Sequence, residues 1–265
     1  PAIHPLAGEV IAEFGRNRQE IASGGPRRYF GLFEPERGKS ERDREMERKV
    51  GTLQQEAFRT WGTLEANTSS AYGIESIYHY SQLVPRDAIV FGGEGQPGRL
   101  VRYLALKSVR VLLAERESVV ERIPASAPYA FAPANVEFIP SGEAALSRLY
   151  EPGFDPRSSL VLVGEPAAVA GSPARWKVSG VEKNWDRIRI TLEATSAGGP
   201  AWFLLNESFH SGWSAEAAGI GALPIRPGNL WAQAMELPQA DAAGRRIELA
   251  FSFRQPGYLP GLAAF

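Results

Sequence analysis

The segment with the most recognisable chemical spacing is the glycine sequence GxGxxG at residues 93–98, built from Gly93, Gly95 and Gly98. It follows a predicted strand and precedes a predicted helix. In dinucleotide-binding folds such glycines allow a tight turn that brings a pyrophosphate to a helix N-terminus, and a later acid binds the ribose. Glu115 stands where that acid would be, but Pro97 removes one backbone N–H from the loop. A surface loop is therefore the preferred interpretation, and a nucleotide-binding enzyme remains the third hypothesis.

Two histidines stand among polar or aromatic neighbours. His79 lies between two tyrosines, and His210 lies close to Ser208 and Ser211. The GxSxG sequence of serine hydrolases is absent, so the second group predicts a hydrogen-bonded turn. We assign no catalytic residue.

Tryptophan is the next candidate, because five of the six tryptophans lie between residues 176 and 231. Sugar-binding sandwiches expose such rings as flat platforms, whereas other sandwiches bury them in the core. Most of these rings are expected to be core, with at least one exposed platform as a hypothesis. The predicted glycan- or partner-binding residues are aromatic and polar groups of two segments: Tyr72, His79, Tyr80, Asn206, His210, Trp213, Asn229 and Trp231.

Composition excludes several classes of protein. The 265 residues carry 29 Lys and Arg against 30 Asp and Glu, and 44% are hydrophobic, which is typical of a folded chain and argues against nucleic-acid binding. There is no cysteine, which excludes disulfides, thiol nucleophiles and cysteine-bound metals. With three histidines, no metal site or cofactor is predicted. No apolar run reaches the roughly 18 to 20 residues that span a bilayer.

Periodicity predicts an α+β fold with two modules. Residues 1–165 are expected to form a mixed α/β module, in which helices and strands alternate. They include predicted helices at 7–22, 41–61, 99–108 and 142–150, and paired strands at 109–114 and 118–123. The Pro, Ala and Gly-rich stretch 166–174 predicts a linker. Residues 175–265 alternate with period two, which predicts an antiparallel β-sandwich.

The sandwich region resembles the C-terminal extracytoplasmic segment of YfhO-type bacterial membrane proteins, which are polytopic and of the GT-C glycosyltransferase type. The matching residues are Leu204-Leu205-Asn206-Glu207, Gly212-Trp213-Ser214-Ala215, Gly219, Asn229, Leu237-Pro238, Gly244, Phe251-Ser252-Phe253, Tyr258 and Gly261-Leu262. Weaker matches in the family's order are Asn67, Tyr72-Gly73-Ile74, Tyr80, 104–114 and 146–156. Ala218 and Phe253 depart from the family, which usually has Asp and Tyr there.

The resemblance implies that this chain is a module on the extracytoplasmic face of a bacterial membrane, periplasmic or extracellular. Flanking transmembrane helices would anchor it, consistent with a chain that lacks an initial Met and ends on apolar residues 261–265. In GT-C enzymes the catalytic acid lies in an early loop between membrane helices, which has no counterpart here. The expected function is accessory binding of an envelope glycan, a lipid-linked sugar through the parent protein, or a partner. The alternative is a free-standing secreted glycan-binding or structural protein.

Overall fold

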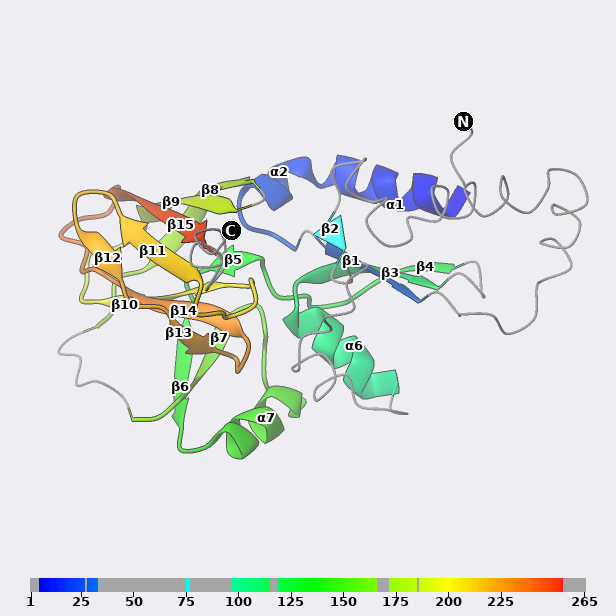
Figure 1. Cartoon of the computed structure of the whole chain (residues 1–265), viewed down its shortest axis with the longest axis horizontal. Coiled ribbons are helices and arrows are strands. Elements are labelled where there is room, and N and C mark those ends of the chain that lie inside the picture. Colours follow the sequence, from blue (N-terminus) through cyan, green and yellow to red (C-terminus); the bar gives the residue numbers. More distant parts are fainter. Residues whose placement is uncertain are drawn as a thin grey trace, which may run out of the picture. The chain divides into compact units, whose positions relative to one another are not determined.

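The computed structural model describes residues 5–26, 28–32, 75–76, 97–114, 119–165, 172–184 and 186–254. It confirms the predicted α+β class, with strands predominating (Figure 1). The chain forms two compact units. Unit 1 comprises residues 1–18 and 26–126, and unit 2 comprises residues 19–25 and 127–265. The predicted helix 41–61, together with Gly93 and Gly95, lies outside the described residues.

The described residues of unit 1 hold a four-stranded mixed sheet and two helices. The elements are α1 (Pro5–Arg16), β1 (Arg28–Leu32), β2 (Glu75–Ser76), α6 (Pro97–Leu106), β3 (Val109–Ala114) and β4 (Val119–Arg122). The strand order is β2-β1-β3-β4, with β1 parallel to β2 and β3. The predicted hairpin of β3 and β4 is confirmed, because these strands pair antiparallel. Since β4 turns straight back after β3, the chain does not cross over there as a dinucleotide-binding fold would.

The predicted helix at 7–22 is divided at Asn17 into α1 and α2 (Arg18–Ala22). Its predicted end at the two glycines is confirmed. Gly24 adopts a left-handed φ of 90°, which glycine adopts at no steric cost, and Gly25 N donates to Glu20 O at 2.8 Å. The chain therefore leaves the helical path through a glycine C-cap.

Unit 2 is a β-sandwich with an added helix and strand pair, as Figure 1 shows. A five-stranded sheet has the order β12-β11-β15-β9-β8, and a four-stranded sheet has the order β13-β14-β10-β5. The bounds are β5 (Ala130–Phe131), β6 (Asn135–Ile139), α7 (Gly142–Tyr150), β7 (Ser159–Val163), β8 (Trp176–Lys183), β9 (Arg187–Ala194), β10 (Ala201–Leu205), β11 (Trp213–Ala217), β12 (Gly221–Leu223), β13 (Arg226–Gly228), β14 (Ala232–Leu237) and β15 (Arg246–Phe253).

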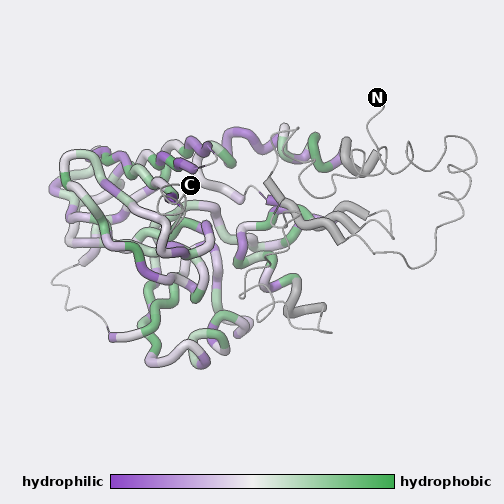
Figure 2. The backbone as a smooth tube through the Cα atoms, in the orientation of Figure 1, coloured by the Kyte–Doolittle hydropathy of each residue, from purple (hydrophilic) through white to green (hydrophobic). Residues whose placement is uncertain are grey.

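The core of unit 2 lies between these two sheets. Period-two alternation turns every second residue inward, and Figure 2 shows apolar residues recurring along these strands. The largest inward side chains include Phe203, Phe251, Leu249, Ile190 and Met235, all essentially inaccessible to solvent. Burial of one face of each sheet accounts for the predicted sandwich.

The four-stranded sheet is buried on its second face as well. There Ala232, Ala234 and Leu204 are fully buried, and Phe138 of β6 packs edge-on against Trp202 with ring centroids 6.1 Å apart. The parallel pair β6–β7 and α7 form this third layer.

One asparagine ties the third layer to the four-stranded sheet. Asn229 N donates to Val161 O at 2.9 Å, and Val161 N donates to Asn229 Oδ1 at 2.8 Å. Asn229 has a left-handed φ of 48°, which asparagine tolerates better than most residues. It therefore supports both the tight β13–β14 turn and the attachment of β7.

The division of the chain lies earlier than the sequence predicted. Strand β5 pairs with β10, so the chain from residue 127 belongs to the same unit as the sandwich. The predicted boundary at 166–174 therefore falls inside unit 2. Within that stretch residues 166–171 are outside the described residues, and Ala174 N donates to Gly199 O at 2.9 Å. No helix among the described residues is long and apolar enough to span a membrane.

The contact between the middle sheet and the third layer can be tested with Gly228→Ala. The added Cβ would lie 2.6 Å from Leu204 Cδ1, 2.8 Å from Ala234 Cβ and 3.0 Å from Leu160 Cδ1. We expect the free energy of unfolding to fall by about 1–3 kcal/mol in urea denaturation, as for other overpacked cores. Gly153→Ala is the control, because nothing lies within 4 Å of its added Cβ. Equal stability of the two variants would contradict this packing.

Candidate functional site

At one end of the paired strands β10 and β14, the apolar core residues are followed by polar residues. Leu205 pairs with Gln233 at the end of the paired segment, and Glu207 and Trp231 follow just beyond the ends of the two strands. Phe209 N donates to Trp231 O at 2.6 Å, which keeps the two chain segments adjacent beyond the ends of the strands. Polar side chains thus follow the core directly.

The opposite sheet brings aromatic and basic groups to the same end of the sandwich. Trp213 pairs with Phe253 across β11 and β15, and their ring centroids are 5.2 Å apart. Trp213 is half-buried against the core. Lys183 is opposite Ile188, a core residue, at the end of β8. We call the combined set the sandwich-end cluster: Tyr129, Lys183, Glu207, His210, Trp213, Trp231, Gln233 and Phe253.

A carboxylate links the two sheets within the sandwich-end cluster. Glu207 Oε1 accepts a hydrogen bond from Tyr129 Oη at 2.6 Å and a second from Lys183 Nζ. The Lys183 ammonium also lies 5.2 Å from the centre of the Tyr129 ring, a cation–π arrangement. Since the side chains of Lys183 and Glu207 are only 21% and 16% exposed, the pair is shielded from most solvent. Its hydrogen bonds and its partial burial hold both charges in place.

Gln233 is the unusual member of the cluster. The residue has no accessible surface, and neither its Oε1 nor its Nε2 has a hydrogen-bond partner among the described residues. A buried amide without partners costs free energy, so native proteins retain few of them. Its position opposite Leu205, near the end of β10, adds amide hydrogen-bonding capacity to the polar end of the sandwich.

The β10–β11 loop covers this end and exposes aromatic groups. His210 Nδ1 accepts from Gly212 N at 3.0 Å, and Arg254 N donates to Gly212 O at 2.9 Å. Gly212 has to be glycine, because an added Cβ would lie 2.7 Å from Phe253 Cε2 and closer still to the backbone of Arg254. His210 is exposed and contacts the Phe253 ring edge-on at 5.5 Å. The loop therefore presents a histidine beside two part-exposed aromatic rings.

The eight residues predicted from sequence fall into three groups. His210 and Trp213 reach the surface of the sandwich-end cluster, as expected for binding groups. Asn206, Asn229 and Trp231 are buried, at 2%, 1% and 3% exposure, which corrects the expectation that they are exposed. The remaining three, Tyr72, His79 and Tyr80, lie outside the described residues.

Burial of the two asparagines follows from their hydrogen bonds. Asn206 Nδ2 donates to Pro128 O at 2.8 Å and Asn206 N donates to Tyr129 O at 2.7 Å, so this residue fastens the segment before β5 to the end of β10. Asn229 fastens β7 in the same way. Both asparagines make hydrogen bonds that hold the fold together, so their presence in the sequence pattern does not mean that they contact a ligand.

Sequence analysis did not propose Tyr129, Lys183, Glu207 or Gln233 as binding residues. One signal was present in the sequence. In the alternating run 232–237, the glutamine occupies an inward position shared with Met235 and Leu237, where an apolar residue is expected. The pairing of Lys183 with Glu207 joins residues 24 positions apart through sheet packing and left no local signal.

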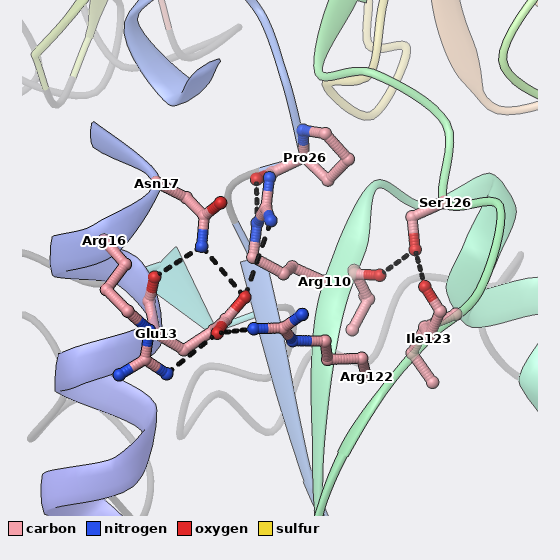
Figure 3. A network of polar contacts seen from close by, with 9 residues as sticks. Glu13, Arg16, Asn17, Pro26, Arg110, Arg122, Ile123 and Ser126 are labelled. Atoms are coloured by element: carbon pink, nitrogen blue, oxygen red, sulfur yellow. Dashed lines mark hydrogen bonds and ion pairs between the residues drawn. The ribbon is translucent and has the colours of Figure 1, made fainter. Parts of the chain in front are cut away.

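Unit 1 contains a second polar cluster that sequence analysis missed, centred on Glu13 of α1 (Figure 3). Its side chain is 5% exposed, and Oε2 accepts from Arg122 Nη2 at 2.6 Å and from Arg16 Nη2 at 3.1 Å. Arg110 Nη1 lies 3.6 Å from Oε1, and Asn17 Nδ2 donates to Oε1 at 2.9 Å. The network fastens α1 to β3 and β4.

The environment of Glu13 changes its acidity. Burial alone would raise the pKa of Glu13, but hydrogen bonds from Arg122 and Arg16 and the charges of Arg122 and Arg110 outweigh it. The pKa of Glu13 therefore lies below its ordinary value of about 4.5. At neutral pH the carboxylate is charged and holds all three guanidinium groups.

Gln233→Met tests whether the buried amide lacks a partner. Removing an unsatisfied amide while keeping the shape of the side chain is expected to raise the free energy of unfolding by about 1–3 kcal/mol. Urea denaturation followed by tryptophan fluorescence measures the change. The control is Gln239→Met, because Gln239 is exposed and should change stability little. A loss of stability in Gln233→Met would mean that the amide is hydrogen-bonded in the folded protein.

The stability of unit 1 is expected to fall in acid because of Glu13. A lowered pKa in the folded state stabilises the fold fully above pH 4.5, the ordinary value, and this contribution is lost as the pH falls through the folded pKa. Glu13→Gln should therefore lower the stability of unit 1 more at pH 7 than at a pH below the folded pKa of Glu13. Urea titration with pulsed hydrogen exchange of peptides covering 109–122 follows this unit. Glu9→Gln, at an exposed site on the same helix, is the control; the same pH profile for both variants would exclude Glu13 as the cause.

Among the described residues, no three His, Asp or Glu side chains gather in a way that could hold a metal ion. No protein-family model, curated protein or solved structure matches this chain. The arrangement of the sandwich-end cluster is therefore the main structural basis for a functional proposal.

Proposed function

We propose that this chain is a non-catalytic binding module that recognises a glycan, or a glycan-bearing partner, through the sandwich-end cluster. The observation that carries the proposal is the combination, at one end of the sandwich, of part-exposed aromatic rings with a shielded set of hydrogen-bonding groups. Trp213 and Phe253 supply the rings, while Lys183 and Glu207 supply donors and acceptors.

Sugars need both kinds of group. The C–H face of a pyranose is apolar and stacks on an aromatic ring, while its hydroxyls need donors and acceptors held in fixed positions. His210 adds an exposed ring nitrogen beside the rings. The Glu207 carboxylate is already oriented by Tyr129 and Lys183, so little side-chain entropy would be lost on binding.

The cellular setting of this proposal rests on the sequence resemblance. We propose that the module lies on the extracytoplasmic face of a bacterial membrane, attached to a polytopic protein similar to lipid-linked-sugar-dependent glycosyltransferases. In that setting it would hold an acceptor glycan of the cell envelope, or a partner, while the chemistry takes place elsewhere in the parent protein. The binding proposal itself applies equally to a free-standing secreted protein.

Trp213→Ala separates binding from folding. We expect affinity for a ligand found by screening envelope oligosaccharides to fall at least about tenfold, because loss of one stacking ring costs on the order of 1.4 kcal/mol or more. Isothermal titration measures it, and far-UV circular dichroism checks the fold. The matched control is Trp176→Phe, since Trp176 is buried in the core and pairs with Ala194, at the opposite end of β9 from Ile188 and Lys183. Unchanged affinity in a folded Trp213→Ala protein would overturn the proposal.

A further inference from the structure

The Glu13 network in unit 1 carries more positive charge than it neutralises. Three guanidinium groups, from Arg16, Arg110 and Arg122, surround a single carboxylate. Arginine stays protonated at every physiological pH. Among the described residues, Arg16 and Arg122 both pair with this one carboxylate, so their two positive charges outnumber its single negative charge. A surplus of this kind attracts anions, provided that the charges can be reached.

Two of these guanidinium groups are open to solvent. The side chains of Arg16 and Arg122 are 63% and 70% exposed, whereas that of Arg110 is 12% exposed. Each of the two exposed groups donates through its Nη2 alone, and both donate to the same oxygen, Glu13 Oε2. Their Nε and Nη1 groups make no hydrogen bond with the described residues. Donors suited to a tetrahedral oxyanion therefore remain on both arginines.

The carboxylate also fixes where these donors lie. Because both Nη2 atoms bond to one oxygen, they cannot be farther apart than the sum of the 3.1 and 2.6 Å distances. Glu13 is itself held by Asn17, as Figure 3 shows. The two guanidinium groups are thus positioned before any ligand arrives, which lowers the entropy lost on binding.

We propose that Arg16 and Arg122, positioned by Glu13, form a binding site for a phosphate group. The carboxyl end of α1 lies at Arg16, so the helix dipole does not attract an anion here, and the guanidinium groups supply the whole attraction. Arginine pairs favour phosphate over halide because the planar fork donates two parallel hydrogen bonds to its oxygens. The site takes a phosphate monoester or inorganic phosphate, and the same chemistry fits the phosphate of a lipid headgroup.

The test is titration of the full chain with inorganic phosphate at constant ionic strength, with sodium chloride as the reference salt. We expect saturable binding by isothermal titration and a rise in thermal stability that chloride does not produce. Arg122→Gln and Arg16→Gln should each weaken binding by roughly tenfold, the usual effect of losing one charge-assisted hydrogen bond. Arg189→Gln, on an exposed position of β9 in unit 2, should leave it unchanged.

A second pair of measurements separates recognition from simple charge. Arg122→Lys keeps the charge and loses the fork, so its affinity should fall between those of the wild type and Arg122→Gln. Hydrogen exchange of peptides covering 109–122 establishes that unit 1 of each variant is folded. No saturable phosphate binding, or equal affinity in folded Arg122→Gln and Arg189→Gln, would overturn the proposal.

The source of the phosphate is distinguished with vesicles. Flotation with phosphatidic acid in phosphatidylcholine vesicles, compared with phosphatidylcholine alone, tests the lipid headgroup. Arg122-dependent flotation assigns the site to a membrane phosphate. Phosphate binding without such flotation assigns it to a soluble phosphate compound.

Discussion

The antiparallel register of β10 and β14 is the constraint on which the candidate site depends. Pairing Leu205 with Gln233 sets which side chains face the core and which groups follow at its end. A shift of β10 by one residue would move Phe203 and Leu205 to the other face of the sheet, and a shift of β14 would do the same to Gln233 and Met235. The register is held because the four-stranded sheet is buried on both faces, so a slipped pairing would place apolar side chains wrongly on each side.

The double burial of this sheet also explains why unit 2 extends beyond the sandwich. A sheet with Ala232, Ala234 and Leu204 on its second face needs a covering layer, and β6, α7 and β7 provide it. Arg148 of α7 donates to both oxygens of Glu137 on β6, at 2.7 and 2.8 Å, which keeps the helix on its strand and lowers the pKa of Glu137. The strands that carry the site, β10 and β14, are therefore packed between two other layers, which restricts their movement.

The sandwich-end cluster departs from good core design in a particular way. An apolar residue at position 233 would fill the same space without leaving a buried amide unsatisfied. Two uncharged residues in place of Lys183 and Glu207 would avoid the free-energy cost of partly burying two charges. Local departures of this kind gather at functional sites in natural proteins, where stability is given up for binding or chemistry. This is why the cluster, more than the exposed loops, is the basis of the functional proposal.

Sequence reasoning succeeded where one local pattern decides the outcome. Period-two alternation was sufficient to predict the sandwich. The two apolar runs 109–114 and 118–123 were sufficient to predict a hairpin, and Gly24 and Gly25 were sufficient to predict where the first helices end. It placed the domain boundary too late, because the pairing of β5 with β10 joins segments about 70 residues apart and has no local signature. It named Trp213 and His210 but missed Lys183 and Glu207 for the same reason.

The most direct test of the central claim is a map of ligand contacts by indole N–H nuclear magnetic resonance of the full chain. On addition of an envelope oligosaccharide, we expect the indole signal of Trp213 to shift in a saturable way. The indole of Trp176, buried in the core beside Ala194, should stay in place. Shifts absent at Trp213, or equal at Trp176 and Trp213, would contradict binding at the sandwich-end cluster.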